Sequence, residues 1–273
     1  MHTKTLTKTE TLTLDKEILF VVLNNEKHSD FKILNNTMQS YITSGISYPY
    51  VVLNYNDEDI RKILKPYLKK AELLVVLFSN TPLISAKTIE NIVEYSLVKN
   101  VNACKLPCGF VFNSKYLKKN KVLSFDAIYS QNEDEFLEVL DEETLKFATR
   151  ILQDRIIKYH AKNGVKFENE HGVIIEPNVD ISFDVTISSN CYIKGNSKIL
   201  QGSNIKENTT IIDSIVEKNV TISNSQIINS VIGEKSIVMP YSYILNSTIG
   251  KDVLIKSNNR LENATISDNK TIE

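Results

Sequence analysis

Residues 174–212 read IIEPNVDISFDVTISSNCYIKGNSKILQGSNIKENTTII, and isoleucine returns in this stretch at every sixth position. The spacing fits neither the 3.6-residue period of a helix nor the two-residue period of a plain strand. A six-residue apolar period is typical of a parallel β-helix, in which each short strand sends one side chain inward. The register continues with slips of one residue, and the eighteen predicted inward positions are Ile175, Ile181, Ile187, Ile193, Ile199, Ile205, Ile211, Val216, Ile222, Ile227, Ile232, Val238, Ile244, Ile249, Ile255, Leu261, Ile266 and Ile272. Three walls per coil make six coils.

The residues between the strands support the same interpretation. Four positions after each of the first six isoleucines the side chain is small or β-branched, which suits a tight corner: Val179, Val185, Cys191, Ser197, Ser203 and Thr209. Turn-forming residues fill the steps between, at Asp184, Asn190, Gly195, Gly202 and Asn208. We therefore predict a β-helix over residues 165–273.

The first half of the chain alternates apolar runs with helical patterns, which is typical of an α/β layer fold. The predicted strands are Ile18–Leu23, Tyr50–Leu53, Leu73–Phe78 and Gly109–Phe112. The predicted helices are Thr37–Ser44, Asp57–Lys70 with Asn56 or Asp57 as its cap, Ser85–Lys99, and Asp141–Asn163. The last helix has an expected buried stripe of Leu145, Ala148, Leu152, Ile156 and Tyr159, and Gly164 ends it.

These patterns predict an α/β Rossmann-like domain followed by a β-helix. The expected division is an N-terminal extension (1–16), an α/β domain (17–140), a linker helix (141–164) and the β-helix (165–273).

Composition excludes several classes of protein. The 273 residues carry a net charge of −1, with no basic stripe along the chain, so nucleic-acid binding is disfavoured. No stretch approaches the roughly 18 apolar residues of a membrane span, and the first residues lack the apolar core of a signal peptide. We therefore expect a cytoplasmic protein. Three cysteines do not form a disulfide framework, and Cys104 and Cys108 are interpreted as buried thiols rather than half of a zinc site.

Several phrases resemble one known family. Residues 73–92 (LLVVLFSNTPLISAKTIENI) resemble the strand–loop–helix of sugar-nucleotide pyrophosphorylases, written as an apolar strand followed by Gly-Asp-x-Pro-Leu. Residues 50–60 resemble the strand and helix that precede it there, and residues 154–176 run from a linker helix into the repeats. With the phrase Asn229-Ser-Val-Ile-Gly-Glu, this order is similar to the bifunctional N-acetylglucosamine-1-phosphate uridyltransferase/glucosamine-1-phosphate acetyltransferase family, over most of residues 17–273. The resemblance implies a left-handed β-helix that packs into a homotrimer.

The resemblance also implies a nucleotide site, and the chain departs from it. The glycine-rich loop that holds the triphosphate in the family is missing, because Gly45 is the only glycine in the first 100 residues. Phe31-Lys32-Ile33-Leu34 resembles the family's Pro-Lys-Val-Leu, which implies a phosphate-binding role for Lys32; a solvated surface lysine is the alternative. Asn80 stands where the family has the aspartate that holds Mg²⁺, and the second ligand falls near Leu140 or Asp141.

The acetyltransferase half of the family needs a general base on the β-helix, where the family uses histidine. All four histidines (His2, His28, His160 and His171) precede the predicted repeats, and no Ser-His-Asp or Cys-His arrangement replaces them.

Three hypotheses follow. The first is a shortened, degenerate member of this UDP-N-acetylglucosamine pyrophosphorylase family in cell-wall precursor metabolism. It is a non-catalytic trimeric scaffold or regulatory paralogue with contact surfaces at Tyr192, Tyr241 and Tyr243, and it keeps Lys32 and Asn80 as remnants of a site for UTP or a UDP-sugar. The second is a working enzyme: an active minimal nucleotidyltransferase that uses Mg²⁺, Asn80 and a carboxylate such as Asp141, or an acyltransferase whose general base is not among the residues named above. The third is a pure partner-binding module.

Overall fold

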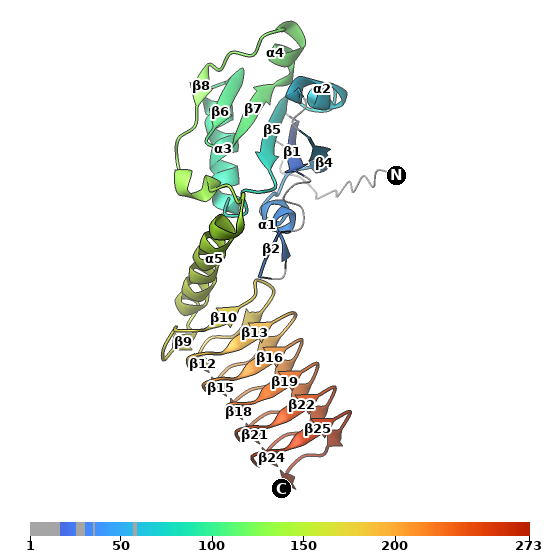
Figure 1. Cartoon of the computed structure of the whole chain (residues 1–273), viewed down its shortest axis with the longest axis vertical. Helices are drawn as coiled ribbons and strands as arrows, with labels where there is room; N and C mark the ends of the chain where they lie inside the picture. The colour runs from blue at the N-terminus through green and yellow to red at the C-terminus, as the bar shows by residue number, and fades with distance from the viewer. Residues whose placement is uncertain (1–16, 26–30, 35, 57–58) are drawn as a thin grey trace. The chain divides into compact units, whose positions relative to one another are not determined.

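The computed structural model describes residues 17–25, 31–34, 36–56 and 59–273 (Figure 1). The chain divides into two compact units, residues 1–151 and 152–273. This division falls inside the predicted linker helix, and the finer four-part division remains a prediction. The predicted extension 1–16 lies outside the described residues.

The first unit is built on one six-stranded sheet. The strands β4, β1 and β5 are parallel, β7 is antiparallel to β5, β6 is antiparallel to β7, and β8 is parallel to β6. In sheet order they are β4 (Tyr50–Tyr55), β1 (Ile18–Asn25), β5 (Leu73–Phe78), β7 (Gly109–Asn113), β6 (Ala103–Leu106) and β8 (Ala127–Ile128). All four predicted strands are confirmed, and β6 and β8 had no clear sequence signal.

Both faces of this sheet are covered, as the continuous apolar run of β1 predicts. On one face Phe20 and Val22 share a core with α1 (Met38–Ser44) and α3 (Ala86–Val98). On the other face Leu19 and Val21 share a core with α2 (Ile60–Leu64) and α4 (Ser114–Lys119). The result is a three-layer α/β/α sandwich. A small antiparallel hairpin, β2 (Lys32–Ile33) and β3 (Asn36–Thr37), precedes α1.

The prediction for the second helix was wrong at both ends. The cap is Asp59, whose carboxylate accepts the backbone N–H of Arg61 at 3.0 Å, rather than Asn56 or Asp57; Asp57 itself lies outside the described residues. The α-helical part ends at Leu64 and continues as a 3₁₀ turn, Lys65–Tyr67. Pro66 explains the early end, because it has no backbone N–H to continue the α-helical ladder.

Helix α5 (Glu142–Lys162) matches the predicted long helix, and Gly164 follows it with a φ of +89°. Ala148 and Leu152 are buried as predicted. Tyr159 was predicted to be buried but is 64% exposed, whereas its neighbour His160 is only 5% exposed. Leu145 and Ile156 are half-buried, and the buried face runs from Ala148 and Leu152 through Ile157 to His160, which turns position 159 toward solvent.

The second unit is the predicted left-handed parallel β-helix of about six coils. The first wall holds β10 (Ile174–Ile175), β13 (Tyr192–Lys194), β16 (Thr210–Ile212), β19 (Gln226–Ile228), β22 (Tyr243–Leu245) and β25 (Arg260–Glu262). The second holds β11 (Asp180–Ile181), β14 (Lys198–Ile199), β17 (Ile215–Val216), β20 (Val231–Ile232), β23 (Thr248–Ile249) and β26 (Thr265–Ile266). The third holds β9 (Lys166–Phe167), β12 (Thr186–Ile187), β15 (Asn204–Ile205), β18 (Thr221–Ile222), β21 (Ile237–Val238), β24 (Leu254–Ile255) and β27 (Thr271–Ile272).

The eighteen predicted inward positions form the core of this unit. The first fifteen, from Ile175 to Ile255, are at most 6% exposed, and Leu261, Ile266 and Ile272 in the last coil are partly buried. One strand of the solenoid precedes the first predicted inward position, Ile175: Phe167 in β9 pairs with Ile187, inside the predicted range 165–273. His171, expected before the repeats, therefore lies in the turn between β9 and β10.

The corners behave as the turn residues predict. Asp184, Asn190, Gly195, Gly202 and Asn208 all have φ between 55° and 76°, in the left-handed region. A Cβ atom added to Gly195 would lie 2.1 Å from a carboxylate oxygen of Asp213, so this corner has no room for a larger residue.

Candidate functional site

The place to look for a ligand site in an open α/β sheet is the crevice at the carboxyl ends of its parallel strands, where the strand order reverses. In this chain that place is the junction of β1 and β5. From β1 the chain crosses by way of α1 to β4 on one side, and then by way of α2 to β5 on the other. Leu23 lies opposite Phe78 in the register, so the residues that follow them, Asn24 and Ser79, meet at this edge.

Hydrogen bonds join the two strand ends. The Ser79 hydroxyl donates to the side-chain oxygen of Asn24 at 2.8 Å, and the Ser79 backbone N–H donates to the Leu23 carbonyl at 2.9 Å. The Thr81 hydroxyl turns back onto the Phe78 carbonyl at 2.7 Å. At this edge, therefore, neutral polar groups form hydrogen bonds with one another.

Asn80, the predicted remnant of the metal aspartate, lies at this edge and is 5% exposed. Its amide nitrogen donates to a carboxylate oxygen of Glu138 at 3.4 Å, and its backbone carbonyl accepts the N–H of Val139 at 2.7 Å. Glu138 also lies beside the thiol of Cys108. Burial is the main reason why the pKa of this thiol is raised, and the negative charge of Glu138 raises it further. Glu138 is therefore the carboxylate that accepts a hydrogen bond from the Asn80 side chain.

The segment before α5 brings a second carboxylate nearby. Glu135, in the 3₁₀ turn Glu133–Phe136, accepts the backbone N–H of Ser85 at 2.8 Å and the Ser85 hydroxyl at 3.2 Å. Ser85 is the cap of α3, so this carboxylate occupies the positive end of that helix, which would otherwise attract an anion.

Asp141, the carboxylate suggested by the sequence, does not serve this site. It caps α5, accepting the backbone N–H of Thr144 at 2.8 Å and its hydroxyl at 2.7 Å. Sequence reasoning missed Glu138 because its contact with Asn80 spans 58 residues and follows no periodic pattern.

Lys32, the predicted phosphate lysine, is exposed on β2 and lies opposite Thr37 in the small hairpin. Among the described residues, no interaction joins Lys32 to Asn80. The predicted glycine-poor loop after β1 includes residues 26–30, which lie outside the described residues.

The donor set at this edge is weak for a cation. One carboxylate and one amide offer few of the six or more oxygen ligands of a typical divalent-cation site, and the amide nitrogen is turned to the carboxylate. Over the described ranges, we find no group of three or more His, Cys, Asp or Glu side chains that is arranged to hold a metal ion.

The β-helix offers no reactive centre in its core. Its inward side chains are aliphatic, and its cysteine, Cys191, is fully buried at a corner. Burial raises the pKa of the Cys191 thiol to about 11, so a thiolate nucleophile does not form there near neutral pH. Cys104 and Cys108 are likewise buried and free, as predicted.

The fold is a Rossmann-like α/β unit with a mixed sheet, followed by a parallel β-solenoid of about six turns. A family model described as the GMPPB C-terminal domain matches residues 161–273. The chain is 28% identical over 224 residues to the bifunctional protein GlmU of Thermodesulfovibrio yellowstonii, which covers 81% of this chain and 48% of that protein. It is 32% identical over 173 residues to GlmU of Campylobacter lari (63% and 38% covered) and 37% identical over 99 residues to GlmU of Streptococcus thermophilus (36% and 22% covered).

The chain is therefore similar to the GlmU proteins, and its second unit matches the GMPPB C-terminal domain model. It spans less than half the length of these curated relatives. Among solved structures, the acetyltransferase domain of PglB from Neisseria gonorrhoeae FA1090 aligns over 93% of this chain and 95% of that chain, with 12% identity and a TM-score of 0.22. A similarity at that level carries no argument. No helix among the described residues is long and apolar enough to cross a membrane.

Proposed function

We propose that this GlmU-like chain is a non-catalytic homotrimeric scaffold or regulatory relative in sugar-nucleotide metabolism for the cell wall. The observation that carries the proposal is the contact between Asn80 and Glu138. Nucleotidyl transfer needs a divalent cation to neutralise the charge that develops on the phosphates. At the edge of β5 the chain presents an amide that is hydrogen-bonded to the carboxylate of Glu138.

The surrounding charges support the same conclusion. Glu135 and Glu138 both approach this end of the sheet, and Glu135 already occupies the N-terminus of α3. A triphosphate without a well-held cation would meet these carboxylates at close range. No glycine precedes Gly45 in the whole sequence, so the backbone after β1 lacks the residues that allow close approach to phosphates.

A metal-binding experiment tests this proposal. Calorimetric titration with Mn²⁺ should give no specific binding to the unaltered protein, whereas Asn80→Asp should create a weak site because two carboxylates then face each other. The double variant Asn80→Asp with Glu138→Gln is the matched control and should lose that site again. Specific Mn²⁺ binding by the unaltered protein that Glu138→Gln abolishes would contradict the proposal.

The alternative is an active minimal nucleotidyltransferase that forms UDP-N-acetylglucosamine from UTP and N-acetylglucosamine 1-phosphate. The position of Glu138 favours it, since this carboxylate reaches Asn80 at the expected edge of the sheet. Thermal unfolding separates the two functions, because a ligand that binds only the folded state raises the melting temperature. UTP with Mg²⁺ should raise the melting temperature if the chain is an active nucleotidyltransferase, and should leave it unchanged if the chain is a non-catalytic scaffold.

The proposed trimer rests on one wall of the β-helix. The outward face of the β10–β25 wall carries half-buried apolar side chains in two ladders. One holds Ile174, Tyr192 and Tyr243, with Thr210 and Gln226 between the tyrosines, and the other holds Ile212, Ile228 and Leu245. Lys194 lies 3.8 Å from the ring centre of Tyr192, and Arg260 lies 4.8 Å from that of Tyr243. Tyr241, at the corner before β22, is 68% exposed.

The packing of copies through this wall supplies the homotrimer that the family resemblance implies. Light scattering should give about three times the 31.0 kDa chain mass. Tyr243→Lys should dissociate the assembly, and Thr248→Lys on another wall should leave it intact. A monomeric unaltered protein, or equal effects of the two changes, would contradict this interface.

A further inference from the structure

A strongly basic surface lies on and beside α2 and α4, away from the Asn80 edge. Nine basic and two acidic residues fall within residues 59–72 and 115–121, a net charge of +7 in a chain whose total is −1. Eight of these are exposed lysines: Lys62, Lys65, Lys69, Lys70, Lys115, Lys118, Lys119 and Lys121. We call this set the α2–α4 basic surface. The sequence-based expectation of no basic stripe is wrong here, because the surface is assembled from two segments about fifty residues apart.

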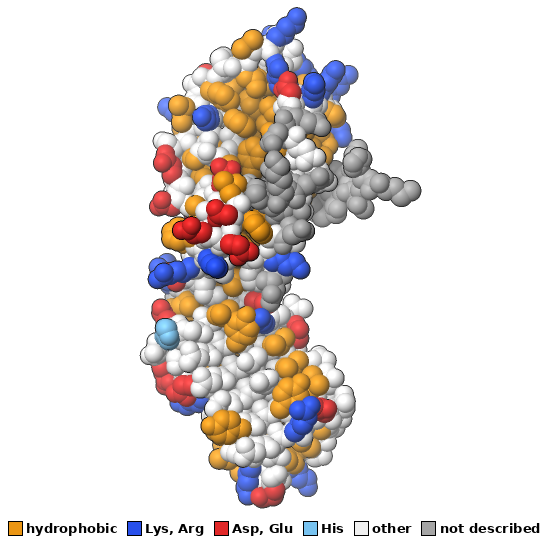
Figure 2. All heavy atoms as spheres, in the orientation of Figure 1, with side chains coloured by type: hydrophobic (Ala, Val, Ile, Leu, Met, Phe, Trp, Pro, Cys, Tyr) orange, Lys and Arg blue, Asp and Glu red, His pale blue; other side chains and the backbone are white. Residues whose placement is uncertain are grey.

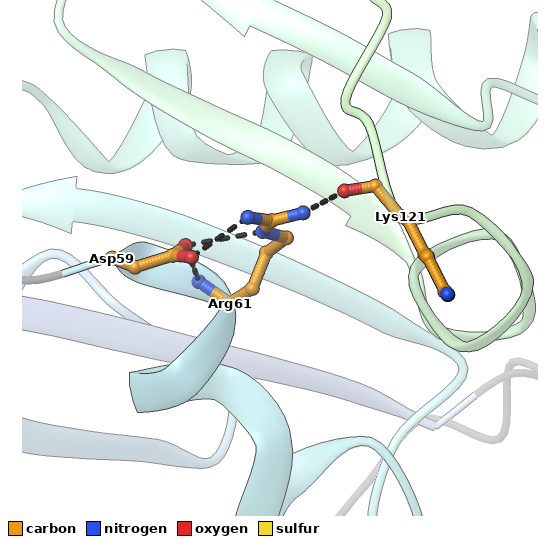
Figure 3. Close-up of polar contacts among 3 residues, drawn as sticks. All are labelled: Asp59, Arg61 and Lys121. Carbon is orange, nitrogen blue, oxygen red and sulfur yellow. Dashed lines mark hydrogen bonds and ion pairs between the residues drawn. The ribbon is translucent and has the colours of Figure 1, made fainter.

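The fold makes these two segments into one surface. Leu64 and Tyr67 after β4, and Leu117 in α4, are buried in the same core on one face of the sheet, so the lysines between them face outward. The Arg61 guanidinium joins the segments directly, since it donates to the backbone oxygen of Lys121 while it pairs with Asp59 (Figure 3). Figure 2 shows basic side chains over this end of the α/β unit.

The positive charge of the surface is largely uncompensated. A carboxylate oxygen of Asp59 pairs with the Arg61 guanidinium at 2.7 Å, and a carboxylate oxygen of Glu72 lies 3.8 Å from the Lys115 ammonium nitrogen. Within the described part of the chain, no carboxylate pairs with the other seven lysines. Lysines at such density repel one another unless an external anionic surface accepts them.

Exposed apolar side chains adjoin these lysines. Val122, which follows Lys121 directly, is 79% exposed. Phe125 is 40% exposed, and its ring stacks on Phe110 with the centroids 5.7 Å apart. A surface that combines lysines with uncovered apolar side chains fits the interface of a bilayer, where the charges meet anionic head groups and the apolar groups enter the acyl boundary.

We propose that the α2–α4 basic surface docks this protein peripherally on bilayers that contain anionic phospholipids. Lysine supplies nearly all of its charge, as expected for head groups recognised as point charges; nucleic-acid recognition favours arginine. The one arginine, Arg61, is already committed within the chain. The docking is independent of any reaction at Asn80.

Vesicle flotation with the full chain tests the proposal. The protein should float with vesicles of phosphatidylcholine containing about a third phosphatidylserine, and not with phosphatidylcholine alone. The double change Lys118→Glu with Lys119→Glu should weaken binding about tenfold or more, and added salt should weaken the unaltered protein similarly. Val122→Asp should also reduce binding, through the apolar contact.

The matched control is Lys198→Glu with Lys218→Glu, two exposed lysines of the β-helix, which changes the net charge equally. It should float like the unaltered protein, and unchanged circular dichroism verifies folding of every variant. Equal losses in both double variants would overturn the proposal, because net charge alone would then explain binding. Failure to float at physiological salt, or binding of duplex DNA in preference to anionic vesicles, would also overturn it.

Discussion

Ile205 lies in the middle of the isoleucine ladder, and its truncation to alanine tests whether that ladder is the core of the second unit. Ile205 is 0% exposed and stands between Ile187 and Ile222 of the adjoining coils. Three methylene equivalents at about 0.8 kcal/mol each give about 2.4 kcal/mol of lost burial. The backbone on both sides is fixed by hydrogen bonds of 2.9 Å (Ser188 to Ile205) and 2.8 Å (Lys206 to Ile222), so the wall has little freedom to collapse.

A residual cavity of about 50 Å³ therefore adds about 1.2 kcal/mol, and the expected loss of unfolding free energy is about 3.5 kcal/mol. Ile266→Ala is the control, because Ile266 occupies the same inward position in the last coil but is only partly buried. The loss of unfolding free energy in Ile266→Ala should be about half of that in Ile205→Ala, or less. Urea unfolding followed by far-ultraviolet circular dichroism measures both. Losses below about 1 kcal/mol for Ile205→Ala, or equal losses for the two variants, would refute the reasoning.

Three further outcomes are expected. Tyr241→Asn should raise the unfolding free energy by about 0.5 to 1 kcal/mol, because the bulky exposed Tyr241 is held at a φ of 66° that asparagine tolerates better; an unchanged urea midpoint would contradict this. Burial lowers the pKa of His160 below its ordinary 6.5, so the unfolded chain takes up a proton that the folded chain resists. The unfolding free energy should therefore keep its full value above about pH 6.5 and decrease as the pH falls below it. His160→Gln should remove this part of the pH dependence of the urea midpoint. Burial raises the pKa of Cys104 to about 11, so a thiol reagent at neutral pH should modify Cys104 slowly in the native protein and rapidly in urea; fast native modification would contradict its burial.

The β-helix was predictable because every coil repeats one environment. Each inward isoleucine occupies the same place in a wall, and each corner needs a residue that accepts a positive φ, so the signal recurs along the chain. The strand that lacked this signal was β9, where Phe167 takes the place of an aliphatic residue. The list of inward positions therefore began at Ile175, although the predicted range 165–273 includes β9.

The candidate site was predictable only in part. Asn80 was found because a local phrase resembles a family motif, and the strand before it is continuously apolar. Glu138 was not found, because it reaches Asn80 from a loop with no regular pattern. The α2–α4 basic surface was missed for the same reason: its two segments come to share one core, through Leu64 and Leu117, only after the sheet has formed.

The most direct test of the proposed function is release of pyrophosphate from UTP and N-acetylglucosamine 1-phosphate in the presence of Mg²⁺. We expect no pyrophosphate release above the background of heat-inactivated protein, and no difference between the unaltered chain and Glu138→Gln. Turnover that Glu138→Gln abolishes, while the exposed neighbour change Glu133→Gln leaves it intact, would show that the Asn80 edge is a working active site and would contradict the account.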